Sequence, residues 1–105
     1  MNYYILDEKG NLADAENLTD WATWMEEGGG INRIVAKTEV GPYRVSTVFL
    51  GINHRFIGKG PPILWETMIF GPDGDGEYQT RYSSLSDAKY GHVVAIEHAK
   101  EMVGK

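Results

Sequence analysis

The stretch 63–70 (ILWETMIF) constrains the fold more than any other part of the sequence, because it is apolar on both sides of an extended chain. Trp65 and Ile69 fall on one side of such a chain, and Leu64 and Met68 fall on the other. Half-exposed strands alternate between apolar and polar residues, whereas a strand buried on both faces is apolar almost throughout. The stretch therefore predicts a central strand of a sheet that is covered on both sides.

Further strands are predicted around this one. Four other segments are rich in β-branched and aromatic residues and are bounded by turn residues: 2–6, 31–40, 43–52 and 78–82. The first is expected at an edge of the sheet. Gly41-Pro42 is the expected turn between the second and the third.

Two helices complete the prediction. Ser84 with Asp87 three positions later matches a capping box at the start of a C-terminal helix. Its apolar stripe is formed by Leu85, Ala88, His92, Ala95, Ala99 and Met102. Asn17 or Thr19 caps an earlier helix that is expected to reach about Glu27. The order β-α-β-β-β-β-α predicts an α+β fold, with an antiparallel sheet of four to five strands and two helices in a single layer on one face.

Composition narrows the classes of function. A chain of 105 residues with 42% hydrophobic and 24% charged residues predicts one globular domain over 1–105. The net charge of −5 argues against general nucleic-acid binding, which needs a basic surface. There is no cysteine, no apolar run of membrane-spanning length and no signal peptide, so no membrane association is expected and the cytosol is the expected location.

Neither a metal nor another cofactor is predicted. The acidic segment 71–77 spaces its carboxylates like a calcium loop but lacks the glycine and the final glutamate of such loops, so it is interpreted as a turn. His92 and His98 are six positions apart and would point from different faces of a helix. The sequence also has no dinucleotide fingerprint and no serine in a nucleophile-elbow context.

Two polar residues fall where the pattern predicts burial. Glu66 has apolar neighbours two positions away in both directions, and a buried carboxylate must be paired, hydrogen-bonded or protonated. His92 lies within the apolar stripe of the C-terminal helix, beside Gly91, which allows close approach. If the two side chains meet where the helix crosses the sheet, they form either a site or a polar contact of the core. A half-covered strand with Glu66 reaching water is the other interpretation.

Cationic residues suggest a binding site for an anion. The glycine-containing loop 53–62 gathers His54, Arg55 and Lys59, a group that either grips an anion or forms a solvated loop tip. Arg81, near the end of a predicted strand, is a natural partner for Glu66 or for an anionic ligand. Trp24 falls off the main stripe of the first helix and is a candidate anchor for a partner.

Four segments, VSTVFLGINH (45–54), GPPILWETMIFG (60–71), RYSS (81–84) and AKYGH (88–92), resemble a widespread group of small proteins of tailed phages and prophages that generally carry no assigned function. The likeness covers about residues 31 to 95. The positions that recur in that group correspond here to His54, Glu66, Thr67, Arg81, Tyr82, Gly91 and His92. The chain departs from the group's pattern after His54, where Arg55, Phe56, Ile57 and Lys59 follow. The resemblance implies a phage-encoded accessory protein in the bacterial cytoplasm.

Three functions remain in competition. The first is a non-enzymatic binding module for a host protein or a small anionic ligand, for example one that sequesters a nucleotide signal. Its candidate ligand-binding residues are His54, Arg55, Lys59, Glu66, Thr67, Arg81, Tyr82 and His92. The second is a structural homo-oligomer that pairs through a sheet edge or Trp24. The third, which is disfavoured, is an enzyme in which Glu66 acts as base and His92 or His54 as acid; it requires Glu66 and His92 on the same side of the sheet.

Overall fold

A computed structural model describes residues 3–29, 33–56 and 58–104 and has the predicted α+β fold. Four strands form one antiparallel sheet in the order β3-β4-β5-β6. Their bounds are Ile34–Val40 (β3), Tyr43–Phe49 (β4), Trp65–Phe70 (β5) and Gly76–Tyr82 (β6). The two-residue turn between β3 and β4 places Gly41 at φ 59°, a left-handed conformation that suits glycine. Strand β5 begins two residues later than the predicted 63–70 and is central, as predicted.

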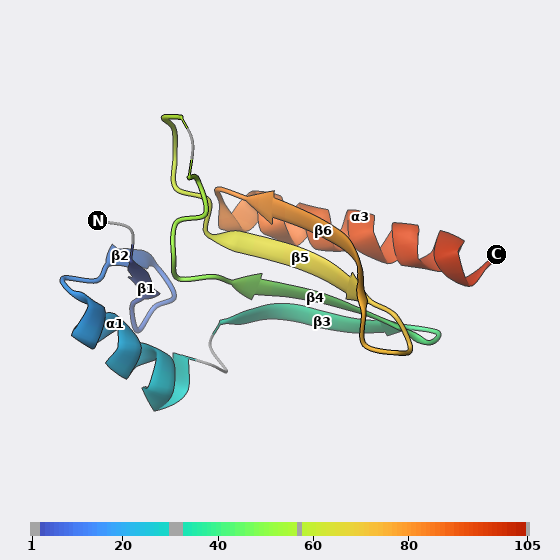
Figure 1. The fold of residues 1–105 in the computed structure, drawn as a ribbon, viewed down its shortest axis with the longest axis horizontal. Helices are drawn as coiled ribbons and strands as arrows, with labels where there is room; N and C mark the ends of the chain where they lie inside the picture. Colours follow the sequence, from blue (N-terminus) through green and yellow to red (C-terminus); the bar gives the residue numbers. More distant parts are fainter. Residues whose placement is uncertain (1–2, 30–32, 57, 105) are drawn as a thin grey trace.

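The C-terminal helix α3 (Leu85–Val103) lies against one face of this sheet and contacts all four strands (Figure 1). Ser84 caps it as predicted, because its side chain accepts a hydrogen bond from the backbone N–H of Asp87 at 3.1 Å. The buried side of the helix consists of small residues and one histidine: Ala88, Gly91, His92, Ala95 and Ala99. Small residues allow the helix axis to approach the sheet closely.

The N-terminal segment differs from the prediction. Strand β1 (Tyr4–Leu6) pairs with an unpredicted strand, β2 (Leu12–Asp14), in a separate two-stranded hairpin, so the main sheet has four strands. The turn between them closes through a hydrogen bond from Asp7 N–H to the Asn11 carbonyl at 2.8 Å. Because the turn follows β1 directly, the chain folds back and β1 pairs with β2 instead of with a strand of the main sheet. The predicted strand started at Asn2, which lies outside the described residues.

The first helix, α1 (Leu18–Trp24), begins at the predicted cap Asn17 and is followed by a π-helical turn, η1 (Met25–Gly29). The apolar face of this helix is only partly covered: Trp21 and Ala22 are half-buried, whereas Leu18 is 55% exposed. It lies beside the hairpin at one end of the sheet (Figure 1). Two helices were predicted to cover the sheet, but α3 alone of the described helices lies on its face. Helix α1 reaches the same core through Trp24.

Two clusters of buried residues fill the space between the sheet and α3. One is formed by Val45, Ile69, Ala95 and Ala99, toward the C-terminal end of the helix. The other is formed by Phe49, Leu64, Trp65 and Ala88, and the partly buried Tyr4, Leu6 and Trp24 of the N-terminal segment pack against it. The prediction that β5 is covered on both sides is confirmed in part: α3 covers one side, and on the other side Glu66 is buried while Met68 and Phe70 are partly buried.

Candidate functional site

Alternation along β4 and β5 assigns the predicted site residues to opposite faces of the sheet. Val45, Thr47 and Phe49 of β4 are buried and face α3. Thr67 is paired with Thr47 across β4 and β5, so it shares that face. Glu66, one position earlier, must point to the opposite face. We call this opposite side of β3–β6 the open face.

On the face that α3 covers, His92 joins this helix to the sheet through a chain of hydrogen bonds. Its Nδ1 lies 2.7 Å from Thr47 Oγ1, and its Nε2 lies 3.0 Å from Thr38 Oγ1. Thr47 Oγ1 is in turn 2.6 Å from Thr67 Oγ1. A neutral imidazole has one donor and one acceptor nitrogen, and the hydroxyls can supply the complementary partners. Both ring nitrogens are thus used inside the protein, and the histidine is a polar contact of the core.

Burial gives this histidine a testable effect on stability. Desolvation by burial lowers the pKa of His92, so the folded protein holds the ring neutral at pH values where the unfolded chain is already protonated. Between the ordinary pKa near 6.5 and the lower folded value, the unfolded state binds more protons, and stability falls as the pH falls. We expect the wild type to lose more unfolding free energy than His92→Gln between pH 7.5 and 5.5, measured by urea unfolding. Equal losses in the two proteins would contradict this assignment.

Tyr82 packs against the helix backbone beside His92. A Cβ atom at Gly91 would overlap both the hydroxyl and the ring of Tyr82, so the ring occupies the space that the missing side chain leaves. The prediction of close approach at Gly91 is confirmed, and the approaching group is an aromatic ring. Burial raises the pKa of the Tyr82 hydroxyl, and this hydroxyl has no hydrogen-bond partner among the described residues. Tyr82 is therefore a packing residue in this structure.

On the open face, Glu66 is held by two donors. Arg81 Nε and Gln79 Nε2 lie 2.9 Å and 2.7 Å from the same carboxylate oxygen, Oε2. Arg81 is directly opposite Glu66 in the ladder between β5 and β6, and Gln79 is its diagonal neighbour. The Glu66 side chain is 11% exposed and that of Arg81 39% exposed. The prediction that a cation holds Glu66 is confirmed. Gln79 was missed, although its position two residues before Arg81 would have suggested it.

Around this ion pair, the open face mixes apolar and charged side chains. Val48 is opposite Glu66, and Met68 and Phe70 follow Glu66 along the same side of β5. All three are partly buried, and the Arg44 guanidinium lies over the Phe70 ring, 5.0 Å from its centre. Neighbouring side chains, rather than a second layer of helices, shield this side of β5.

The cationic loop is closed on itself. The Asn53 side-chain oxygen accepts hydrogen bonds from the backbone N–H groups of Arg55 and Ile63, at 2.8 Å and 2.9 Å. Arg55 Nε donates to the Pro61 carbonyl at 2.8 Å, and His54 Nδ1 lies 2.7 Å from the Ile52 carbonyl. The loop projects beyond the end of the sheet (Figure 1). Arg55 and His54 thus use one nitrogen each to fix the loop.

The eight predicted ligand-binding residues therefore lie in three places. Thr67, Tyr82 and His92 lie between the sheet and α3; Glu66 and Arg81 lie on the open face; His54, Arg55 and Lys59 lie in the loop. Within the described parts of the chain, no side-chain hydrogen bond or ion pair joins one group to another. The hypothesis of an enzyme with Glu66 and His92 as base and acid is wrong, because the sheet separates the two side chains. The eight residues therefore do not form one binding site.

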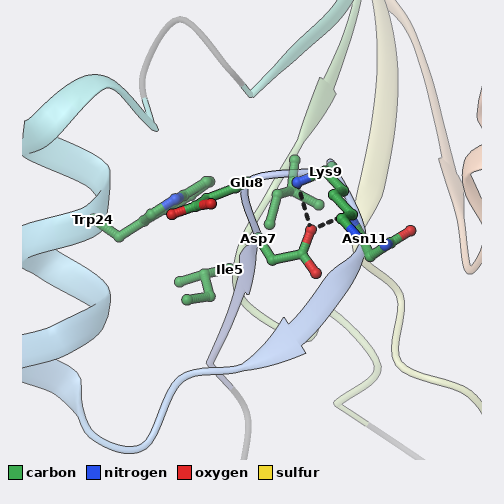
Figure 2. A pocket seen from close by; sticks show the side chains of 8 residues that line it. Ile5, Asp7, Glu8, Lys9, Asn11 and Trp24 are labelled. Carbon is green, nitrogen blue, oxygen red and sulfur yellow. Dashed lines mark hydrogen bonds between the residues drawn. The ribbon is translucent and has the colours of Figure 1, made fainter.

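A wide hollow of about 1000 Å³ lies away from all three groups, between the β1–β2 turn and Trp24 (Figure 2). Figure 2 shows Asp7 fixing the turn, where its carboxylate accepts hydrogen bonds from the N–H groups of Lys9 and Asn11 at 2.9 Å and 2.8 Å. Trp24 packs edge-on against Phe49, with ring centres 6.0 Å apart. The hypothesis that Trp24 anchors a partner is not supported, since its ring anchors the N-terminal segment to the core.

No protein-family model, no curated protein and no solved structure matches the chain. In residues 3–29, 33–56 and 58–104, no helix is both long and apolar enough to cross a membrane. The same residues contain no group of three or more histidine, aspartate or glutamate side chains arranged to hold a metal ion.

Proposed function

We propose that this protein is a non-enzymatic binding module that docks a protein partner on the open face of its sheet. The observation that carries the proposal is the Glu66 carboxylate, fixed by Arg81 and Gln79 among partly exposed apolar side chains. Both donors bind Oε2, so Oε1 is directed to no donor among the described residues. A partner with an N–H donor flanked by apolar groups would complement this arrangement.

The geometry favours a protein partner over a small anion. A small ligand needs a concave site with a few converging polar groups, whereas the predicted cations lie in separate places. The open face instead offers partly buried Met68 and Phe70 beside a preorganised ion pair. Charged groups that are already held in position lose little freedom on binding, which favours affinity.

The resemblance to small phage and prophage proteins supports a cytoplasmic role in a bacterial host, with a host protein as the partner. Inhibition of a defence protein is one such role. An enzymatic function has no support in the geometry, because no acid, base and cation of the predicted set converge around a cavity.

A photo-reactive amino acid placed at Arg44, on the open face, tests the proposal in the bacterial cytoplasm. We expect it to crosslink a host protein that the same group at Val93, on the outer side of α3, does not capture. With the purified partner, Arg44→Glu is expected to weaken binding about 10-fold or more, a change of about 1.4 kcal/mol. Lys89→Glu makes the same charge change on α3 and is the matched control, expected to change affinity less than about 2-fold.

Two results would contradict the proposal. One is a partner that crosslinks equally from Arg44 and Val93 and that binds both charge variants equally. The other is a nucleotide that raises the melting temperature of the free protein and loses this effect in Arg55→Ala. That result would instead identify a small anionic ligand at the loop.

A further inference from the structure

Strand β3 is an outer strand of the sheet and pairs with β4 alone among the described strands (Figure 1). An outer strand has a row of backbone N–H and C=O groups that no neighbouring strand uses, and another strand can bind to them. Along β3, every second residue directs its N–H and C=O groups away from β4. The two-residue turn closes Val40 against Tyr43, so the backbone groups of Val40 and Thr38 face β4. Those of Lys37 and Glu39 therefore face outward.

A second copy of the chain can pair with this edge in an antiparallel arrangement about a twofold axis. Three registers place the outward-facing groups opposite one another. An axis at Lys37 sets two lysines opposite each other, and an axis at Glu39 sets two glutamates opposite each other. An axis at Thr38 sets Lys37 opposite Glu39 of the second copy, twice. Opposite charges directly across a ladder are favourable and like charges are unfavourable, so the charges select the axis at Thr38.

The length of β3 limits this pairing. A bulge between Ile34 and Ala36 interrupts the regular register at the start of the strand, so the regular edge runs over 36–40. In this register the two Lys37–Glu39 pairs exchange about four backbone hydrogen bonds. Both side chains are exposed on the open face, where they are free to meet. A ladder this short belongs with weak, concentration-dependent contacts rather than with obligate dimers.

We propose that two copies of this protein associate through β3, centred on Thr38, to form a continuous eight-stranded antiparallel sheet. The two open faces then lie side by side on one surface. This inference is independent of the binding function proposed above, since it rests on the edge of β3 and on the charges of Lys37 and Glu39. Either proposal can fail without the other.

Sedimentation equilibrium of the whole chain at low salt, from about 5 to 500 μM, tests the association. We expect the wild type to be a monomer–dimer mixture. Lys37→Glu and Glu39→Lys each set like charges opposite one another and are expected to raise the dissociation constant about 10-fold or more. The double variant Lys37→Glu/Glu39→Lys restores opposite charges and is expected to dimerise like the wild type. Lys89→Glu, which makes the same charge change on α3, is the control and should leave dimerisation unchanged.

An equimolar mixture of the two single variants gives a further test, because the register pairs each acidic edge with a basic one. We expect this mixture to form a heterodimer under conditions where each variant alone is a monomer. A wild type that stays monomeric up to about 500 μM would overturn the inference. So would single variants that dimerise like the wild type, or a mixture that forms no heterodimer.

Discussion

Gly91→Ala is expected to destabilise the protein by roughly 2 kcal/mol or more, even though alanine is the better helix former. In an exposed helix this substitution stabilises by about 1 kcal/mol, because glycine loses more backbone entropy on folding. At Gly91, however, the new methyl group would overlap the ring and hydroxyl of Tyr82, which is held between β6 and α3. Overpacking of this kind costs about 1–3 kcal/mol and sometimes more, so the steric term outweighs the propensity.

Urea unfolding of three variants distinguishes the steric cause from a general effect on α3. Gly104→Ala is the matched control, since a Cβ there meets only ordinary contacts at 3.5 Å and beyond, and we expect a change within about 0.5 kcal/mol. In a Tyr82→Ala background, Gly91→Ala should cost nothing or stabilise slightly, because the ring that it strikes is gone. A Gly91→Ala protein as stable as the wild type would show that the ring is not held against the helix.

His92→Leu is expected to cost roughly 2–3 kcal/mol of unfolding free energy. Leucine has a similar size but can neither donate nor accept, so Thr38 loses its bond to the ring and Thr47 keeps only its bond to Thr67. A polar group that loses its partner costs about 1–3 kcal/mol; here the partly buried Thr38 hydroxyl loses its bond to the ring and the buried Thr47 loses one of its two bonds. The loss should also loosen the contact between α3 and strands β3 and β4.

The comparison with His98→Leu isolates the buried network. His98 lies on the exposed side of α3, so its substitution should change stability by less than about 0.5 kcal/mol. His92→Gln, whose amide can both donate and accept, should lose less stability than His92→Leu. If the leucine variants at the two positions unfold at the same urea concentration, the hydrogen bonds of His92 contribute nothing to the fold.

The main elements of the fold could be predicted because their signals are local. Ser84 with Asp87 marks the start of α3, and the β-branched segments on either side of Gly41-Pro42 mark β3 and β4. The hairpin β1–β2 could not be predicted, since the strand Leu12–Asp14 is only three residues long and its composition resembles that of a loop. The apolar face of α1 has the spacing of a buried stripe, but the helix lies at one end of the sheet, where Trp21 packs against Tyr3 and Leu18 stays exposed.

The candidate site could be predicted in part. The apolar neighbours of Glu66 indicated that its carboxylate needs a partner, and the register of β5 and β6 supplies Arg81. The grouping of Glu66 with Thr67 and His92 failed for a reason that is visible in the sequence. Adjacent strand residues point to opposite faces, so Glu66 and Thr67 cannot share a pocket. Which of the two faces the helix depended on tertiary packing, and no local signal specified it.

The sparse attachment of the N-terminal segment has a consequence for how the molecule opens. Beyond the packing of Tyr4, Leu6 and Trp24, the contacts that tie this segment to the rest include an isolated bridge between Tyr3 and Ile52 and the hydrogen bond from Tyr4 N–H to the Gly51 carbonyl. The Trp21 indole also lies against Gly51. Helix α3, in contrast, contacts all four strands of the sheet and buries Ala88, His92, Ala95 and Ala99. We therefore expect two tiers of stability, in which residues 3–29 detach and reattach while the four strands and α3 remain folded. A protease or a chaperone would therefore meet this end of the chain first.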